Sequence, residues 1–139
     1  MDVKQLLDGS KKSFTRVTSK EAENMQRNYQ RLHERYLKHG ETLLSKGDYL
    51  QASEKFWVAV VEMVKFIAAR RKLRLKTHGE VRKFVRDDLE QKYPNMDIYK
   101  DFMGVSMLHA NFYEDDLESA DVQKLSELAK TLITKLKGI

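Results

Sequence analysis

The segment from Tyr49 to Ala69 constrains the fold more than any other part of this 139-residue chain. Its apolar side chains cover most of the circumference of a helix. A narrow polar strip interrupts them, formed by Gln51, Lys55, Glu62 and Lys65. A helix that is apolar on nearly every side lies in the middle of a protein, surrounded by other elements. No apolar run in the chain reaches the roughly 18–20 residues that a membrane span requires, so we expect no membrane partner.

The residues before this central helix predict a second helix that packs against it. Thr18 followed by Glu21 is a capping box, which marks the start of a helix. Gly47 suits the C-terminal cap of this helix, and Asp48 suits the N-cap of the next. A connection this short predicts an antiparallel hairpin. Apolar and aromatic residues recur between the two caps at spacings of four and three, which indicates the buried side of the helix: Met25, Tyr29, Leu32, Tyr36, His39 and Leu43.

Three more helices follow the central one. A capping box at Thr77 opens the first of them, and Pro94 ends it. Asp97 starts the next, and Ser119 or Asp121 starts the last. In all three, apolar residues recur with the period of a helix, and no segment alternates with period two for long enough to predict a strand.

The sequence therefore predicts an all-α fold, an antiparallel up-and-down bundle of about five helices formed by residues 19–139. Residues 1–18 are expected to form an N-terminal extension that is flexible or loosely docked. Cysteine is absent, which excludes disulfides, thiolate nucleophiles and zinc sites that use sulfur. The first residues lack the apolar core of a secretory signal, so we expect a cytoplasmic protein.

The motifs of several enzyme classes are missing. The four histidines are His33, His39, His78 and His109, and none forms the i, i+4 pair with an adjacent glutamate that a helical zinc site uses. There is also no glycine-rich phosphate loop and no Gly-x-Ser-x-Gly nucleophile turn. We therefore expect neither a metal nor a cofactor.

His109 is the strongest candidate for chemistry. It lies in the apolar seam of the fourth helix, between Val105 and Phe112, within a polar and aromatic stretch that also holds Asn111 and Glu114. We take Asn111 and Glu114 as further catalytic candidates. Two interpretations stay open for His109: a structural histidine hydrogen-bonded to another helix, or a general acid or base in a groove.

A basic run follows the central helix and gives the chain much of its net charge of +5. Such a run offers contacts to phosphate groups, although charged helix ends are often simply solvated. Phe84 is the one aromatic residue among these cations, and we assign it to the core, which argues against base stacking of the single-strand kind. The candidate anion-binding or nucleic-acid-binding residues are Arg70, Arg71, Lys72, Arg74, Lys76, Arg82 and Lys83.

Two motifs resemble a known family. Lys46–Trp57 (KGDYLQASEKFW) and Leu108–Glu114 (LHANFYE) are similar to the archaeal PaREP-type paralogous proteins, which are placed in the HEPN superfamily. The resemblance covers about Tyr36–Leu136. It implies a HEPN-like bundle of four to five helices, often paired into a dimer. The group includes metal-independent ribonucleases and the toxin halves of toxin–antitoxin pairs.

Active members of that superfamily carry an arginine and a histidine separated by roughly four to six residues, where arginine stabilises phosphorane charge and histidine moves the proton. His109 matches this histidine, but no arginine follows Arg86. We therefore expect a non-catalytic, homodimeric module that binds a nucleotide, an RNA or a protein. The alternatives are a divergent metal-independent ribonuclease that uses His109 and a pure protein-interaction scaffold.

Overall fold

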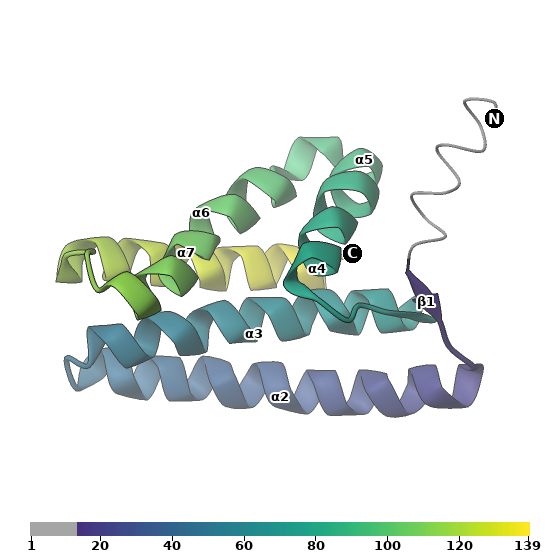
Figure 1. The fold of residues 1–139 in the computed structure, drawn as a ribbon, viewed down its shortest axis with the longest axis horizontal. Coiled ribbons are helices and arrows are strands. Elements are labelled where there is room, and N and C mark those ends of the chain that lie inside the picture. The colour runs from purple at the N-terminus through teal and green to yellow at the C-terminus, as the bar shows by residue number, and fades with distance from the viewer. Residues whose placement is uncertain (1–13) are drawn as a thin grey trace.

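The computed structural model describes residues 14–139, which form a helical bundle (Figure 1). Helices α2 (Ser19–Ser45) and α3 (Tyr49–Arg70) form an antiparallel hairpin. Helices α6 (Ile98–Glu114) and α7 (Ser119–Lys137) contact each other and pack along α3. The predicted all-α bundle is confirmed. None of the helices among residues 14–139 combines the length and the apolar character that crossing a membrane demands.

The caps of the hairpin are those predicted from the sequence. The Thr18 hydroxyl accepts a hydrogen bond from the Glu21 amide at 3.1 Å, and the Asp48 carboxylate accepts one from the Gln51 amide at 3.2 Å. Gly47 has φ of 78°, a left-handed conformation that glycine adopts without strain. Local sequence therefore determines where both helices of the hairpin begin and where the chain reverses.

The central position of α3 is also confirmed, but the buried side of α2 differs from the prediction. Helix α3 contacts α2, α4, α6 and α7. On α2, His39 is exposed, whereas His33 and Gly40 are buried. A Cβ on Gly40 would lie 3.0 Å from the Phe56 ring, so the two helices approach each other closely there. A polar residue and a glycine thus occupy buried positions that an apolar pattern does not reveal.

The segment predicted as one helix from Thr77 to Pro94 contains a change in helical pitch. Thr77 caps it as predicted, by accepting a hydrogen bond from the Glu80 amide at 3.1 Å. Asp97 then precedes α6 with a left-handed φ of 55° and makes no side-chain capping bond. The elements in order are α4 (His78–Phe84), the π-helical turn η1 (Val85–Leu89), α5 (Glu90–Lys92) and the 3₁₀ turn η2 (Pro94–Met96).

Part of the predicted N-terminal extension is packed against the bundle. Strand β1 (Thr15–Arg16) pairs with β2 (Leu73–Arg74) in an antiparallel ladder too short for the sequence pattern to predict. Phe14 is buried, and its ring meets the Phe84 ring edge to face at 5.9 Å. The remainder of the predicted extension, residues 1–13, lies outside the described residues.

Candidate functional site around His109

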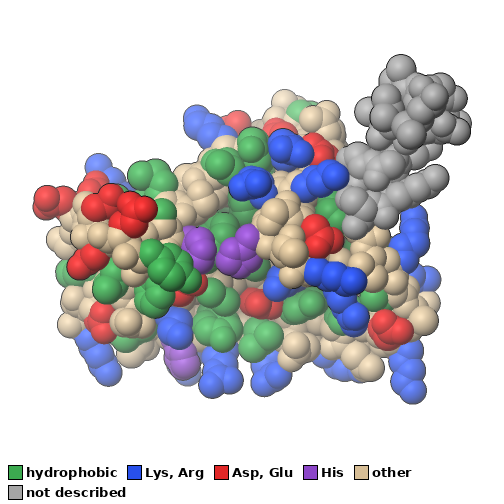
Figure 2. All heavy atoms as spheres, viewed as in Figure 1, with side chains coloured by type: hydrophobic (Ala, Val, Ile, Leu, Met, Phe, Trp, Pro, Cys, Tyr) green, Lys and Arg blue, Asp and Glu red, His purple; other side chains and the backbone are tan. Residues whose placement is uncertain are grey.

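A small hollow opens beside His109, where α3, α4 and α6 meet. Its volume is about 140 Å³. In Figure 2, histidine side chains lie near the centre of the visible face, between hydrophobic side chains and a group of lysine and arginine side chains. No carboxylate is among the residues that line the hollow, which are Trp57, His78, Arg82, Phe102, Met103, Ser106 and His109.

Glu54 on α3 fixes the orientation of the His109 ring. Its Oε2 lies 3.0 Å from His109 Nδ1, and both side chains are half-buried. An ionised carboxylate only accepts hydrogen bonds, so Nδ1 carries the hydrogen of this contact. Nε2 is then the ring nitrogen left for a ligand. A carboxylate that sets the tautomer and orientation of a histidine is a frequent feature of sites at which histidine binds a ligand or moves a proton.

Aromatic rings surround His109 on several sides. Trp57 stacks on it with ring centroids 5.4 Å apart and an interplanar angle of 26°. His78 and Tyr113 meet it edge to face, at 5.1 Å and 5.3 Å. Trp57 is only 4% exposed, and its Nε1 has no hydrogen-bond partner. Since buried N–H groups are nearly always paired, an unpartnered donor in a residue that lines the hollow is unusual.

Helix α4 contributes two of the polar residues that line the hollow. His78 and Arg82 are four residues apart, so they lie on the same side of α4, one turn from each other. Arg82 therefore lines the same hollow as His109, although it comes from a different helix. The sequence signal for this pair is the spacing of His78 and Arg82 directly after the Thr77 cap.

The other predicted cations point to different parts of the molecule. Arg70 donates to the Ile139 carbonyl oxygen at 2.9 Å, and Arg71 lies 3.7 Å from the Asp88 carboxylate. Arg74 lies 3.9 Å from the carboxylate of Glu21 on α2. Arg82 is the one predicted cation that lines the hollow. The three predicted lysines do not line the hollow either. Lys72 and Lys76 are exposed, and Lys83 is half-buried.

The two other catalytic candidates do not line the hollow either. Asn111 is 2% exposed, and its Nδ2 donates to Ser53 Oγ at 3.1 Å. Its Oδ1 accepts a hydrogen bond from the Leu117 amide at 2.8 Å. Asn111 therefore joins α6 and the loop that follows it to α3. Glu114 is exposed in the last turn of α6.

Comparison with known proteins identifies the family. The model of the archaeal PaREP1/PaREP8 family matches residues 28–133. The chain belongs to this family. A crystal structure of a protein from Sulfolobus solfataricus is similar to this PaREP1/PaREP8 protein, with a TM-score of 0.66 and 27% sequence identity over 76% of this chain and 93% of that one. No curated protein matches the sequence. The comparisons establish the family and the fold, and they name no activity.

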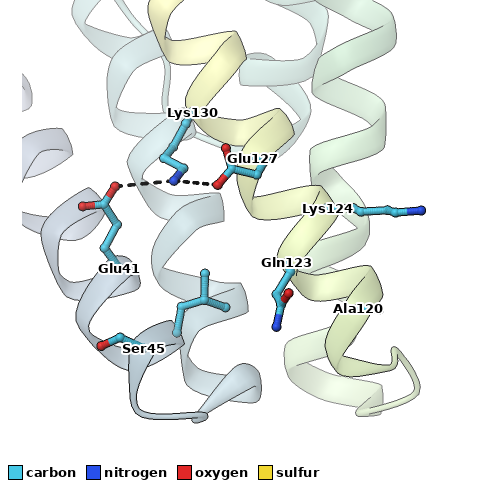
Figure 3. A pocket seen from close by; sticks show the side chains of 8 residues that line it. Glu41, Ser45, Ala120, Gln123, Lys124, Glu127 and Lys130 are labelled. Atoms are coloured by element: carbon cyan, nitrogen blue, oxygen red, sulfur yellow. Dashed lines mark ion pairs between the residues drawn. The ribbon is translucent and has the colours of Figure 1, made fainter.

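A larger hollow of this PaREP1/PaREP8 protein, about 630 Å³, lies between α2 and α7 (Figure 3). Lys130 reaches across it, with Nζ 2.8 Å from Glu127 Oε1 and 3.7 Å from Glu41 Oε1. The hydrogen bond to Glu127 is the main reason that the pKa of Lys130 is raised, and burial opposes this rise. The part of the chain that the structure describes holds no cluster of three or more metal-ligating side chains, here or at His109.

Proposed function

We propose that this PaREP1/PaREP8 protein binds the phosphate group of a nucleotide or RNA in the hollow at His109, without catalysing a reaction on it. The observation that carries the proposal is the convergence of Arg82, His78 and a Glu54-oriented His109 on one hollow that no carboxylate lines. A guanidinium group offers a planar pair of N–H donors that matches two phosphate oxygens.

The orientation of His109 supports the same proposal. A protonated imidazole donates from both nitrogens, so His109 in that form donates through Nδ1 to Glu54 and through Nε2 to a ligand oxygen. His78 adds a second imidazole, 5.1 Å from His109 between ring centroids. Charge-assisted hydrogen bonds of this kind are roughly twice as strong as neutral ones.

Filter binding of labelled RNA and nucleotides across a salt series tests this proposal. We expect the affinity to fall as salt rises, because phosphate contacts release counterions. Arg82→Met should weaken binding about tenfold and lower the salt slope by roughly one. Lys130→Met, in the groove between α2 and α7, is the matched control and should leave binding unchanged. Wild-type protein that binds neither probe, or binds with no dependence on salt, would contradict the proposal.

A second candidate function is metal-independent RNA cleavage, and the pair of imidazoles favours it. One imidazole would take the proton of a ribose 2′-hydroxyl as its oxygen attacks the adjacent phosphorus, while the other protonates the departing 5′-oxygen. The products are a cyclic 2′,3′-phosphate and a free 5′-hydroxyl, and Arg82 would stabilise the phosphorane charge. Both histidines and Arg82 line the hollow, as this reaction requires.

Incubation of mixed RNA with the pure protein and a chelator tests this second candidate. Cleavage that disappears in His109→Ala and in His78→Ala, with both variants folded by circular dichroism, would place it above the binding proposal. Wild-type protein that leaves the RNA intact would retire it.

Pairing of two copies completes the proposal, and we place the contact at the exposed methionines of α6, beside the hollow that Met103 also lines. Met103 and Met107 lie one turn apart on α6, and both are exposed. Together with Tyr113 they are the exposed large hydrophobic residues of the described chain. Light scattering should give twice the monomer mass for wild type and the monomer mass for Met107→Glu. A monomeric wild type would contradict pairing, and a dimeric Met107→Glu would contradict this contact.

A further inference from the structure

The hollow at His109 is too small for a whole nucleotide. Pockets that enclose a drug-sized ligand have volumes of roughly 300–1,000 Å³, whereas this hollow has about 140 Å³. It can accept one phosphate group between Arg82 and the histidines. The sugar and the base of the same ligand must then lie on the protein surface beside the hollow.

Tyr113 is the aromatic side chain that this neighbouring surface offers. It lies one turn after His109 on α6, and its ring meets the His109 ring at 5.3 Å between centroids and 88°. The residue is 72% exposed. Its other aromatic neighbour, Phe112, also meets it edge to face, at 5.2 Å and 87°. Much of the Tyr113 ring is therefore open to a ligand, while two neighbouring rings contact it.

We propose that Tyr113 is a stacking platform for an unpaired base of single-stranded RNA, next to the phosphate held in the hollow. This inference rests on the proposed binding of phosphate at His109. Stacking on an exposed aromatic side chain needs a base with a free face, and bases in the interior of a duplex have none.

The inference reverses one expectation from the sequence. The lack of aromatic residues within the basic run argued against stacking of bases. In the folded chain, the cation comes from α4 and the aromatic ring comes from α6. His109 contacts the Tyr113 ring and also lines the hollow together with Arg82. The two kinds of residue are 31 positions apart in the sequence (Arg82 and Tyr113).

The test compares three probes: a short single-stranded RNA with a 5′-phosphate, the same sequence as a duplex, and inorganic phosphate. We expect wild-type protein to prefer the single strand. Tyr113→Ala should weaken its binding about tenfold, as removal of a stacking ring does elsewhere, and should leave binding of inorganic phosphate unchanged. Tyr113→Phe keeps the ring and should bind like wild type. Replacing one base by 2-aminopurine should give fluorescence that is quenched by wild type and not by Tyr113→Ala.

Each other outcome has a distinct meaning. If Tyr113→Ala binds single-stranded RNA like wild type while Arg82→Met does not, the stacking inference is overturned and the proposed phosphate site stands. If Arg82→Met binds all three probes like wild type, the proposed function itself fails. Equal affinity for duplex and single strand overturns the inference. A Tyr113→Ala variant that no longer binds inorganic phosphate and is also monomeric would overturn the inference as well. Tyr113 would then be a residue of the interface between two copies.

Discussion

The hollow at His109 is smaller than the groove between α2 and α7, yet it is the better candidate for a ligand site. The groove has about 630 Å³ and the hollow about 140 Å³. In the groove, however, Lys130 is paired with two carboxylates (Figure 3). Gln123 there donates to the Tyr49 hydroxyl at 3.5 Å. The hollow has two imidazoles, a guanidinium group and an unpartnered indole N–H at or beside it. The smaller feature is therefore the one with an unpartnered buried donor beside cationic and imidazole groups, and this is why we prefer it as the candidate site.

The origin of the two features explains this difference. Helices α2 and α7 each pack on α3, and the groove is the space left between their sides. The hollow needs side chains from three elements. Two polar contacts, His109–Glu54 and Asn111–Ser53, hold α6 against α3. Substitutions that disturb the contacts between α6 and α3 should therefore have large effects, and substitutions in the groove should have small ones.

The largest effect is expected for Asn111→Ala. The side chain is buried, and its loss would leave the Leu117 amide without its partner. Ser53 Oγ would lose one of its two hydrogen bonds and keep the one it donates to the Tyr49 carbonyl oxygen. An unpaired buried group costs about 1–3 kcal/mol and a lost hydrogen bond about 1 kcal/mol, so the free energy of unfolding should fall by about 2–3 kcal/mol in chemical denaturation. Gln123→Ala removes a polar contact in the groove and should cost less than about 0.5 kcal/mol. Equal losses in the two variants would break the comparison.

The fold was largely predictable because local signals determine its element ends. Thr18, Asp48 and Thr77 cap the helices that the sequence pattern assigned to them. The site was predictable only in part. His109 was found from its polar character in an apolar seam, whereas Glu54 lies 55 positions away from it and Arg82 belongs to another helix. Contacts of this range depend on how α3, α4 and α6 cross, which periodicity within a single helix does not specify.

A smaller effect is expected where α2 crosses α3 next to the groove. A methyl group on Gly40 would lie 3.0 Å from the Phe56 ring, which is fully buried. Overpacking costs about 1–3 kcal/mol and the higher helix propensity of alanine returns up to about 1 kcal/mol. Gly40→Ala should therefore lower the free energy of unfolding by about 1–2 kcal/mol without changing RNA affinity.

Gly79→Ala is the matched control for this substitution, because its new methyl group would lie 3.6 Å from Thr77 Oγ1, an ordinary contact distance. It should be neutral or slightly stabilising in the same denaturation experiment. A Gly40→Ala protein as stable as wild type would show that Phe56 has room to move, and that α2 is less closely fixed to α3 than we infer.

Lys130→Met should have a still smaller effect. The pairs that Lys130 forms with Glu41 and Glu127 are exposed to solvent, and such pairs contribute about 0–1 kcal/mol. Because the pKa of Lys130 is raised, mainly by its hydrogen bond to Glu127, this contribution is complete below the ordinary lysine pKa of 10.5 and is lost as the pH rises above it. Denaturation at pH 7 should show a loss of less than about 1 kcal/mol that shrinks in 1 M salt. A larger loss of unfolding free energy that does not depend on salt would mean that the contacts in the groove stabilise the fold as much as those at the hollow.

The smallest effect concerns an unpartnered atom that lies outside both features. Glu62 Oε2 is buried without a partner on α3, and burial raises the pKa of this carboxyl above its ordinary 4.5, with Lys65 lowering it in part. The native state therefore holds the proton at pH values where the unfolded chain has lost it, so wild-type stability falls as the pH rises through that interval.

Glu62→Gln carries no charge, so we expect it to be more stable than wild type at pH 7 by about a few tenths of a kcal/mol. The two should converge below about pH 4, where the wild-type carboxyl is protonated in both states. Thermal denaturation from pH 3.5 to 7.5 measures this. If the gain in stability persists at low pH, then side-chain shape, rather than charge, separates the two proteins. The buried carboxylate of Glu62 would then not be the cause of the lower wild-type stability at pH 7.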